Sequence, residues 1–470
     1  MTEPPIHRPS EAGRANHRHR ADAVRGDRAY EVPRGWSRLS PDDTMQLAAE
    51  ASGARMQFAA VAVLDGAPSL AALRSLIGSR LAAVPRLRHR LVRVPYGRPI
   101  WMDDPDFDLR RHVLSVTCPA PGDRAALLAV TARLVTARLS LARPLWRITQ
   151  VTGLTGGCSA VVIVLHHVLA DGLAGLAVLS RLVDGEVDAG PAPTMTRPTA
   201  TELRAEARAQ RRRIVADLPG LPGRLRAAAA ELLDGGTGSA PRCAINAGPV
   251  GPGRALAVAE ADLGAVIAAA KEVGGTVNDV VLTAATGALA TFLADRDEMP
   301  DRLVVSIPIT ARRPADAAEL GNRVGVLPVS LPVTGPPQQR LPVVAAVTRE
   351  RKTETPGAST ALYRPFVRVL AEVGAFGWFI GHQRLVNTFV TNLRGPRETL
   401  SLGGFRLAEL IPVSAINGNV AVAFAVLSYA GRLTVTVVVD PDRCPGVDRL
   451  AELLQAQLDA LVRVSVEPAT

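Results

Sequence analysis

The first half of the chain alternates short apolar runs with segments in which apolar residues recur every three or four positions. The runs are typical of buried strands, and the recurring pattern is typical of amphipathic helices. Residues 56–66 are predicted to form a strand ending in a turn, and residues 69–84 a helix with Ser69 as its N-cap. The same criteria predict further strands at 87–95, 98–104, 145–151 and 159–167 and further helices at 121–140 and 173–185.

The second half of the chain repeats this alternation. Strands are predicted at 254–262, 302–310, 324–333, 387–393, 404–413, 419–431 and 433–441, and helices at 263–274, 277–296, 341–354, 361–385 and 446–464. Because helices alternate with strands in both halves, we expect an α/β protein with mixed sheets, in which each half forms one sandwich domain.

A change in composition separates the two halves. At 470 residues the chain is too long for one ordinary domain. The first 35 residues form a polar segment that we expect to be disordered. We predict a first domain at 36–184, a Pro- and Gly-rich linker with a strongly basic helix at 185–250, and a second domain at 251–470.

The net charge of +10 says little about function, because nearly all the basic residues are arginine in a chain rich in Ala, Gly and Pro. That combination indicates a GC-rich coding bias. A basic surface attracts phosphates in general. The sequence has no zinc-finger spacing, aromatic-basic RNA motif or basic zipper, so no nucleic-acid partner is expected.

The four cysteines are far apart and include no CxxC pair, so we expect neither a metal site nor a disulfide framework. Reduced cysteines favour a cytoplasmic location. The N-terminus lacks the apolar core of a signal peptide. The apolar runs are shorter than ten residues, whereas a membrane-spanning helix needs about 20, so no transmembrane helix is expected.

The most informative stretch is an apolar run that ends in two adjacent histidines, His166 and His167, followed by Asp171 and Gly172. Successive side chains of a strand point to opposite faces, so one imidazole can face the interior and the other a cleft. Asp171 is expected to pair with an arginine and hold the turn, and Gly172 to let the backbone turn into the next helix. An imidazole in a cleft can act as a general base. Two structural histidines at a strand end are the alternative.

The pattern HHxxxDG at 166–172 resembles the active-site motif of the CoA-dependent acyltransferase superfamily, which includes chloramphenicol acetyltransferases and peptide-synthetase condensation domains. Further segments, from about Arg38 to Leu461, resemble one branch in its order: the bacterial wax ester synthase/diacylglycerol acyltransferase family. These segments are LSPDDTMQLAAE (39–50), VPRLRHRLVRVPYGRPIWMDDPDFDLRRHV (84–113), RPLW (143–146), GGTVNDVVL (274–282), ELGNRVGVLPVSLPV (319–333), TNLRGP (391–396) and SYAGRLTVTVVVDPD (428–442).

This resemblance implies two chloramphenicol-acetyltransferase-like domains that meet along a substrate tunnel. It implies that His167 is the general base and that the acceptor oxygen attacks the thioester directly, without an acyl-enzyme. His166 is then a supporting residue, and Asp171 orients the loop. Gly172 provides the turn and a candidate oxyanion N–H group.

The resemblance also implies roles for two other short motifs. Asn278 and Asp279 support the site from the domain interface, although both are also good residues with which to begin a helix. Pro144, Leu145 and Trp146 contact substrate or, in the alternative that we favour slightly, fix a strand and fill the core. The chain departs from the family pattern at two positions, Arg147 and Thr391.

The partners implied are acyl-CoA as co-substrate and diacylglycerol or a long-chain alcohol as acceptor, with no bound cofactor and no metal. Peripheral contact with a membrane or lipid-droplet surface is a further expectation. The aromatic segment 371–386 and the basic helix at Arg211–Arg213 are candidates for that contact. Two alternatives stay open: an acyltransferase with a carrier-protein donor, and a non-catalytic lipid- or CoA-binding module.

Overall fold

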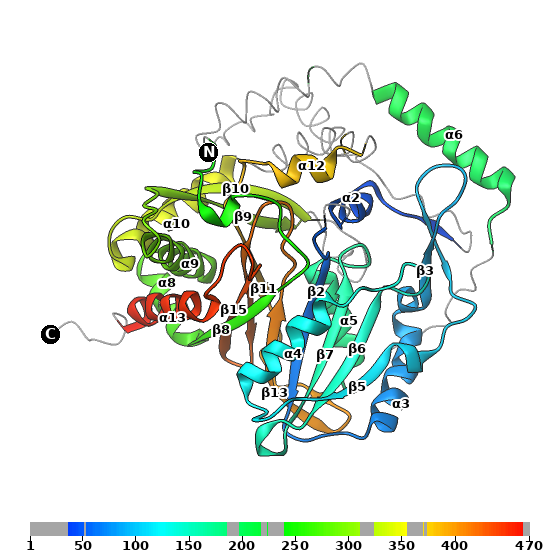
Figure 1. Ribbon diagram of the computed structural model, residues 1–470, viewed down its shortest axis with the longest axis horizontal. Helices are drawn as coiled ribbons and strands as arrows, with labels where there is room; N and C mark the ends of the chain where they lie inside the picture. The colour runs from blue at the N-terminus through cyan, green and yellow to red at the C-terminus, as the bar shows by residue number, and fades with distance from the viewer. Residues whose placement is uncertain are drawn as a thin grey trace, which may run out of the picture.

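The computed structural model describes residues 36–50, 53–185, 197–217, 223, 239–310, 324–354, 370 and 374–463. The N-terminal segment predicted to be disordered and much of the predicted linker lie outside these residues. Within them the chain builds two mixed six-stranded sheets with helices packed on them, so the predicted α/β fold class is confirmed (Figure 1).

The first sheet has the strand order β12-β13-β2-β7-β6-β5. Its strands are β2 (Gln57–Leu64), β5 (Val113–Thr117), β6 (Trp146–Thr152), β7 (Ser159–His166), β12 (Ser401–Leu402) and β13 (Phe405–Val413). Every residue of β7 is buried. A continuous apolar run such as 160–165 is expected in a central strand that is covered on both faces.

The helices of the first half are α2 (Pro41–Glu50), α3 (Leu70–Arg80), α4 (Arg124–Thr136) and α5 (Gly172–Leu182). The predicted N-cap of α3 is confirmed, because the Ser69 hydroxyl accepts a hydrogen bond from the Ala72 N–H. A small sheet of β1 (Ser37–Arg38), β4 (Ile100–Asp103) and β3 (His89–Val92) lies at the edge of this half, and α6 (Ala200–Asp217) packs near it through an Arg38–Glu206 ion pair.

The second sheet has the strand order β10-β9-β11-β14-β15-β8. Its strands are β8 (Ala255–Asp262), β9 (Arg302–Thr310), β10 (Val324–Pro332), β11 (Thr388–Arg394), β14 (Val422–Tyr429) and β15 (Arg432–Val439). The helices that accompany it are α8 (Leu263–Glu272), α9 (Val277–Ala294), α10 (Pro337–Glu354), α12 (Phe376–Gly381) and α13 (Val447–Arg463). In α13 the buried leucines Leu450, Leu454 and Leu458 recur every four residues, as the sequence pattern predicts.

One strand pair from the second half belongs to the first sheet. β13 pairs antiparallel with β2, from Leu407 opposite Leu64 to Val413 opposite Ala59. This covers the edge of β2, which would otherwise expose unpaired backbone groups. The division of the chain into domains at 36–184 and 251–470 stays a prediction, and residues 401–413 complete a sheet built mainly by the first half.

Among the described strands and α-helices, the prediction missed α2, β5 and the two-residue strands β1 and β12. The expectation that the apolar segments are too short to cross a membrane also needs correction. Helix α9 is long and apolar enough to cross a membrane, although its apolar runs are interrupted by Thr and Gly. Most of α9 (72%) is buried inside the protein, which is typical of the core helix of a folded domain. Of the helix predicted at 361–385, residues 370 and 374–385 are described; α12 ends at Gly381, so the predicted end at 385 was too late.

Candidate active site

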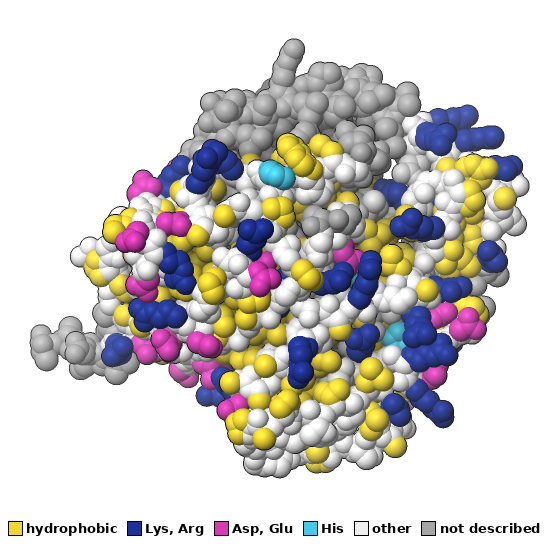
Figure 2. Space-filling view, in the orientation of Figure 1, with side chains coloured by type: hydrophobic (Ala, Val, Ile, Leu, Met, Phe, Trp, Pro, Cys, Tyr) yellow, Lys and Arg dark blue, Asp and Glu magenta, His cyan; other side chains and the backbone are white. Residues whose placement is uncertain are grey.

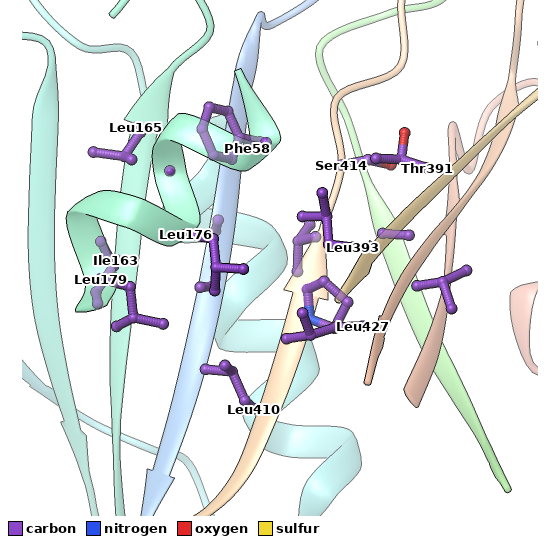
Figure 3. A pocket seen from close by; sticks show the side chains of 18 of the residues that line it. Phe58, Ile163, Leu165, Leu176, Leu179, Thr391, Leu393, Leu410, Ser414 and Leu427 are labelled. Atoms are coloured by element: carbon purple, nitrogen blue, oxygen red, sulfur yellow. The ribbon is translucent and has the colours of Figure 1, made fainter. Parts of the chain in front are cut away.

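An apolar pocket lies where α5 and the first sheet face the second sheet (Figure 3). It contains about 750 Å³ of space not filled by atoms, part of it open to solvent. The first half contributes Phe58, Ala59, Ala60, Ile163, Leu165, His167, Gly172, Gly175, Leu176 and Leu179. The second half contributes Thr391, Leu393, Leu410, Pro412, Val413, Ser414, Ala425, Val426 and Leu427.

The two histidines occupy opposite sides of the first sheet. In the register of β2 and β7, Leu165 is opposite Phe58, and His166 is opposite Gln57. Leu165 and Phe58 line the pocket, whereas Gln57 donates to the Val135 carbonyl at the end of α4, on the other side. His167 follows directly after β7 and lines the pocket, with its ring centroid 4.9 Å from that of Phe58. The pleat of β7 therefore presents one imidazole to the cavity.

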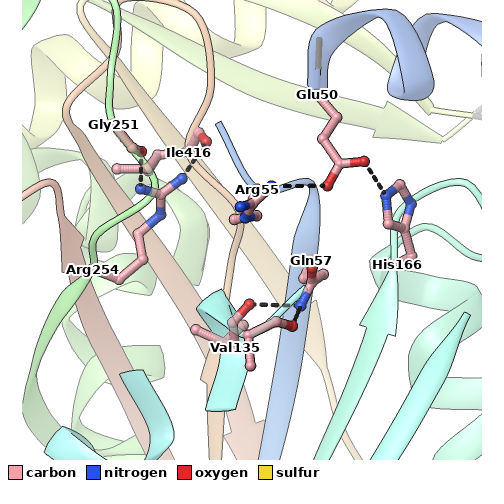
Figure 4. A network of polar contacts seen from close by, with 9 residues as sticks. Glu50, Arg55, Gln57, Val135, His166, Gly251, Arg254 and Ile416 are labelled. Atoms are coloured by element: carbon pink, nitrogen blue, oxygen red, sulfur yellow. Dashed lines mark hydrogen bonds and ion pairs between the residues drawn. The ribbon is translucent and has the colours of Figure 1, made fainter. Parts of the chain in front are cut away.

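His166 is held by hydrogen bonds at both ring nitrogens. The side chain is 1% exposed, its Nδ1 accepts from the Val168 N–H at 3.0 Å, and its Nε2 lies 3.3 Å from a Glu50 carboxylate oxygen (Figure 4). Since Nδ1 accepts a hydrogen bond, the proton of the neutral ring is on Nε2, which donates to Glu50. This arrangement fixes the turn that follows β7.

Glu50 is a site residue that the sequence reasoning missed. It is the last residue of α2, and its other carboxylate oxygen lies 4.0 Å from Arg55. Burial raises the pKa of Glu50, but the hydrogen bond from His166 and the charges of Arg55 and Arg138 outweigh burial, so the pKa lies below its ordinary value of 4.5. In the sequence, Glu50 is marked only by its position at the end of the segment 39–50, which resembles the family.

Asp171 and Gly172 form the start of α5. The Asp171 carboxylate is buried and accepts a hydrogen bond from the Ala174 N–H at 2.9 Å, so this residue is the N-cap of the helix. Its predicted arginine partner stays a prediction. Gly172 does not have the positive φ that the predicted sharp turn suggested. A Cβ at this position would instead lie 3.3 Å from the Leu393 side chain, so the glycine allows α5 to approach β11.

Asn278 and Asp279 lie in the first turn of α9. The Asp279 carboxylate accepts hydrogen bonds from the backbone and hydroxyl of Thr276 and from the Thr348 hydroxyl, and it is buried. The Asn278 side-chain oxygen lies 3.5 Å from the Asn392 amide nitrogen, which follows the pocket residue Thr391 on β11. In the described part of the chain, neither residue lines the pocket.

Pro144, Leu145 and Trp146 are buried in the core of the first half. The Trp146 indole N–H donates to the Leu87 carbonyl at 2.7 Å, and its ring stacks on His112. The Leu145 carbonyl accepts from the His166 N–H, so this segment fixes the backbone at the end of β7. The favoured expectation, a core and strand-fixing role, agrees with these contacts better than contact with substrate.

The comparisons with known proteins identify the family. The family described as wax ester synthase/diacylglycerol acyltransferase catalytic domain matches residues 39–281, and the family's C-terminal domain matches residues 320–462. The chain belongs to this family. The family resemblance and the predicted class of enzyme, an acyltransferase, are therefore confirmed.

A curated relative supports the assignment over most of its length. The "probable diacylglycerol O-acyltransferase tgs1" of Mycobacterium tuberculosis is 31% identical over 430 residues, which cover 87% of this chain and 92% of the relative.

Solved structures show the same fold. The wax ester synthase/diacylglycerol acyltransferase of Marinobacter aquaeolei VT8 superposes with a TM-score of 0.67 at 22% identity, covering 91% of this chain and 100% of that one. The starter condensation domain of rhizomide synthetase, solved in complex with C8-CoA, superposes with a TM-score of 0.61 at 16% identity, covering 96% and 97%. At 22% and 16% identity, the similarity to these two structures shows a shared fold only.

The two departures from the family pattern lie in different surroundings. Thr391 lines the pocket, so its hydroxyl is one of the few polar groups there. Arg147 is partly buried on β6, and in the described part of the chain the pocket lining does not include it. Burial lowers the pKa of Arg147. Of the two departures, only Thr391 stands where it can touch a pocket ligand.

Ser414 is a second pocket residue that the sequence reasoning missed. It follows β13, which joins the first sheet from a distance of more than 340 residues along the chain, and no local pattern signals that pairing. With His167 and Thr391 it supplies the polar side chains of the lining.

Proposed function

We propose that this member of the family is an acyl-CoA-dependent O-acyltransferase that esterifies diacylglycerol, giving triacylglycerol, and also long-chain alcohols, giving wax esters. The observation that carries this proposal is the position of His167 on the wall of an apolar pocket between the two sheets. Such a pocket suits fatty acyl chains, and an imidazole is the side chain best suited to accept a proton near neutral pH.

In the proposed mechanism, His167 accepts the proton of the acceptor hydroxyl while the oxygen attacks the thioester carbonyl. The tetrahedral intermediate then collapses, the carbon–sulfur bond breaks, and the CoA thiolate takes the proton from the imidazolium. The ester forms in this sequence without an acyl-enzyme. This scheme requires no cysteine nucleophile. Cys158 is half-buried in the loop before β7, and its Sγ lies 3.9 Å from the Gly156 carbonyl oxygen.

The N-terminus of α5 is the proposed source of oxyanion stabilisation. Gly172 lines the pocket and is the first residue of this helix, where backbone N–H groups have no intrahelical acceptor. Asp171 holds this turn, and the Glu50–His166 pair holds the turn before it. The proposed roles are thus general base for His167, donor for the Gly172 backbone, and support for His166, Asp171 and Glu50.

Acyl-CoA is the proposed co-substrate, and we propose no bound cofactor and no metal. The described residues contain no cluster of three or more His, Cys, Asp or Glu side chains suited to a metal ion.

We also propose a cytoplasmic protein that contacts a membrane or lipid-droplet surface through α12. Trp378 on this short helix is 69% exposed, and its ring stacks on His382. Figure 2 shows hydrophobic side chains gathered over α12, with basic side chains on both sides. Trp is favoured at the membrane interface, and basic residues are attracted to anionic lipids. Helix α12 packs on α2, the helix that carries Glu50.

The experiment that tests the function measures CoA release from palmitoyl-CoA with a diacylglycerol or a long-chain alcohol as acceptor, and resolves the products by chromatography. We expect acceptor-dependent ester that disappears with His167→Ala. Ester formed only from an acyl carrier protein would instead favour a carrier-protein donor. Absence of ester from either donor, in a folded protein, would favour a binding module.

Vesicles that contain anionic lipid test the proposed surface. Trp378→Ala should co-sediment with them less than the unaltered protein does, while its turnover of a water-soluble short-chain acceptor stays unchanged. Equal sedimentation of the two proteins would exclude α12 as the contact.

A further inference from the structure

The hydroxyl of Ser414 is buried, yet it has no hydrogen-bond partner among the residues that the structure describes. It lines the apolar pocket that His167 also lines. A buried hydroxyl without a partner is destabilising, so such a group in a ligand pocket favours a partner that arrives with the ligand.

The register of the first sheet gives the direction of this side chain. Val413 is opposite Ala59 and Pro412 is opposite Ala60 on β2. One further step along β13 places Ser414 beside Phe58, on the face where Phe58 packs against the His167 ring. Leu165 lies opposite Phe58 on the other side of β2, so Ser414 and Leu165 share one row of the sheet, and His167 follows two residues further along β7. Figure 3 draws Ser414 and Thr391 at the same end of the pocket.

The loop that carries Ser414 is anchored. The buried guanidinium of Arg254 donates to the Ile416 carbonyl at 3.0 Å and to the Gly251 carbonyl at 2.7 Å (Figure 4). These hydrogen bonds fix the backbone two residues beyond Ser414, at the edge of the pocket.

We infer that Ser414 is a substrate-binding residue whose hydroxyl donates a hydrogen bond to a carbonyl oxygen of the acyl or ester group held beside His167. A fatty acyl thioester or a diacylglycerol brings few polar atoms into an apolar pocket, and its carbonyl oxygens are the acceptors among them. This inference rests on the proposed function for the identity of the substrate. It assigns to β13 a second role beyond completing the sheet.

The test compares Ser414→Ala with a matched control, Thr149→Val. Thr149 on β6 also has a fully buried hydroxyl without a partner among the described residues, but it is not a pocket residue. Removing either hydroxyl should leave Tm unchanged or raise it, because each removes an unpaired polar group. Only Ser414→Ala should lower kcat/KM with palmitoyl-CoA, about two- to twelvefold for a neutral hydrogen bond and about 10²-fold if the bond strengthens in the transition state.

A second variant and a binding measurement complete the test. Ser414→Cys keeps a weak donor of similar size and should give a smaller loss than alanine does. The rise in Tm that palmitoyl-CoA produces should be smaller in Ser414→Ala than in the unaltered protein. Unaltered kcat/KM and an unaltered rise in Tm would overturn the inference, and so would a fall in the Tm of the free variant, which would show a structural role.

The two hypotheses fail in different ways. If the unaltered protein forms no ester but palmitoyl-CoA still stabilises it more than it stabilises Ser414→Ala, the proposed function fails and the binding role stands. If the unaltered protein forms ester and Ser414→Ala forms it equally well, the binding role fails alone.

Discussion

The two faces of the first sheet differ sharply at the end of β7, although adjacent residues build them. On one face His166 is buried and both of its ring nitrogens have partners, Val168 and Glu50. On the other face His167 lines an apolar pocket with Phe58 and with Ser414, whose hydroxyl has no partner among the described residues. On the first face, the two hydrogen bonds hold the His166 ring in place. On the second, the His167 ring and the Ser414 hydroxyl lie where a ligand of the pocket can reach them, so adjacent histidines have different surroundings and, in our proposal, different roles.

The largest expected effect comes from the pocket face. His167→Ala should lower kcat by about 10²–10⁴-fold, the usual contribution of a general base, while the free energy of unfolding changes little. Steady-state kinetics and urea unfolding of the same preparation measure both quantities. Residual ester formation above a tenth of the normal rate would mean that another group takes the proton.

The opposite result is expected on the supporting face. His166→Ala should lower the free energy of unfolding by about 1–3 kcal/mol or more, because the Val168 N–H and the Glu50 carboxylate lose their partner. Activity should also fall, since the turn that carries His167 loses its anchor. A variant as stable as the unaltered protein in urea would remove the distinction between the two faces.

A smaller loss of stability is expected at the start of α5. Asp171→Ala removes the N-cap and should cost about 0.5–2 kcal/mol, whereas Asp171→Asn keeps a capping oxygen and should cost less. Thermal unfolding of the pair measures the difference. Equal losses in the two variants would show that the negative charge, rather than the capping geometry, is what α5 needs.

The smallest effect concerns pH. The pKa of Glu50 is lowered in the folded protein, so its contribution to stability is complete above its ordinary value of 4.5 and is lost as the pH falls through the lower folded-state value. Glu50→Gln should therefore lose less stability than the unaltered protein does on acidification across that window. Urea unfolding at a series of acidic pH values provides the measurement, and parallel curves for the two proteins would exclude Glu50 from the acid response.

Prediction from sequence succeeded where the signal was local. The apolar run of β7, the periodic leucines of α13 and the Ser69 cap of α3 are each specified within a few residues. It failed for α2, in which only Asp43 and Ala49 are buried, and for β5, where polar Ser115 and Thr117 alternate at an edge. At Gly172 the structure shows a close approach instead of a positive φ, because a Cβ there would lie 3.3 Å from the Leu393 side chain of another strand, and no local pattern signals that contact.

The sequence by itself determined the α/β class, the order of most elements, the family and the His166–His167 dipeptide, because local periodicity and short motifs carry that information. The tertiary structure alone decided that Glu50 supports His166, that β13 completes the first sheet, and that Ser414 faces the pocket of His167. These contacts join residues more than a hundred positions apart. Their formation depends on which buried surfaces and strand edges must be covered in the folded chain, and no local pattern records that requirement.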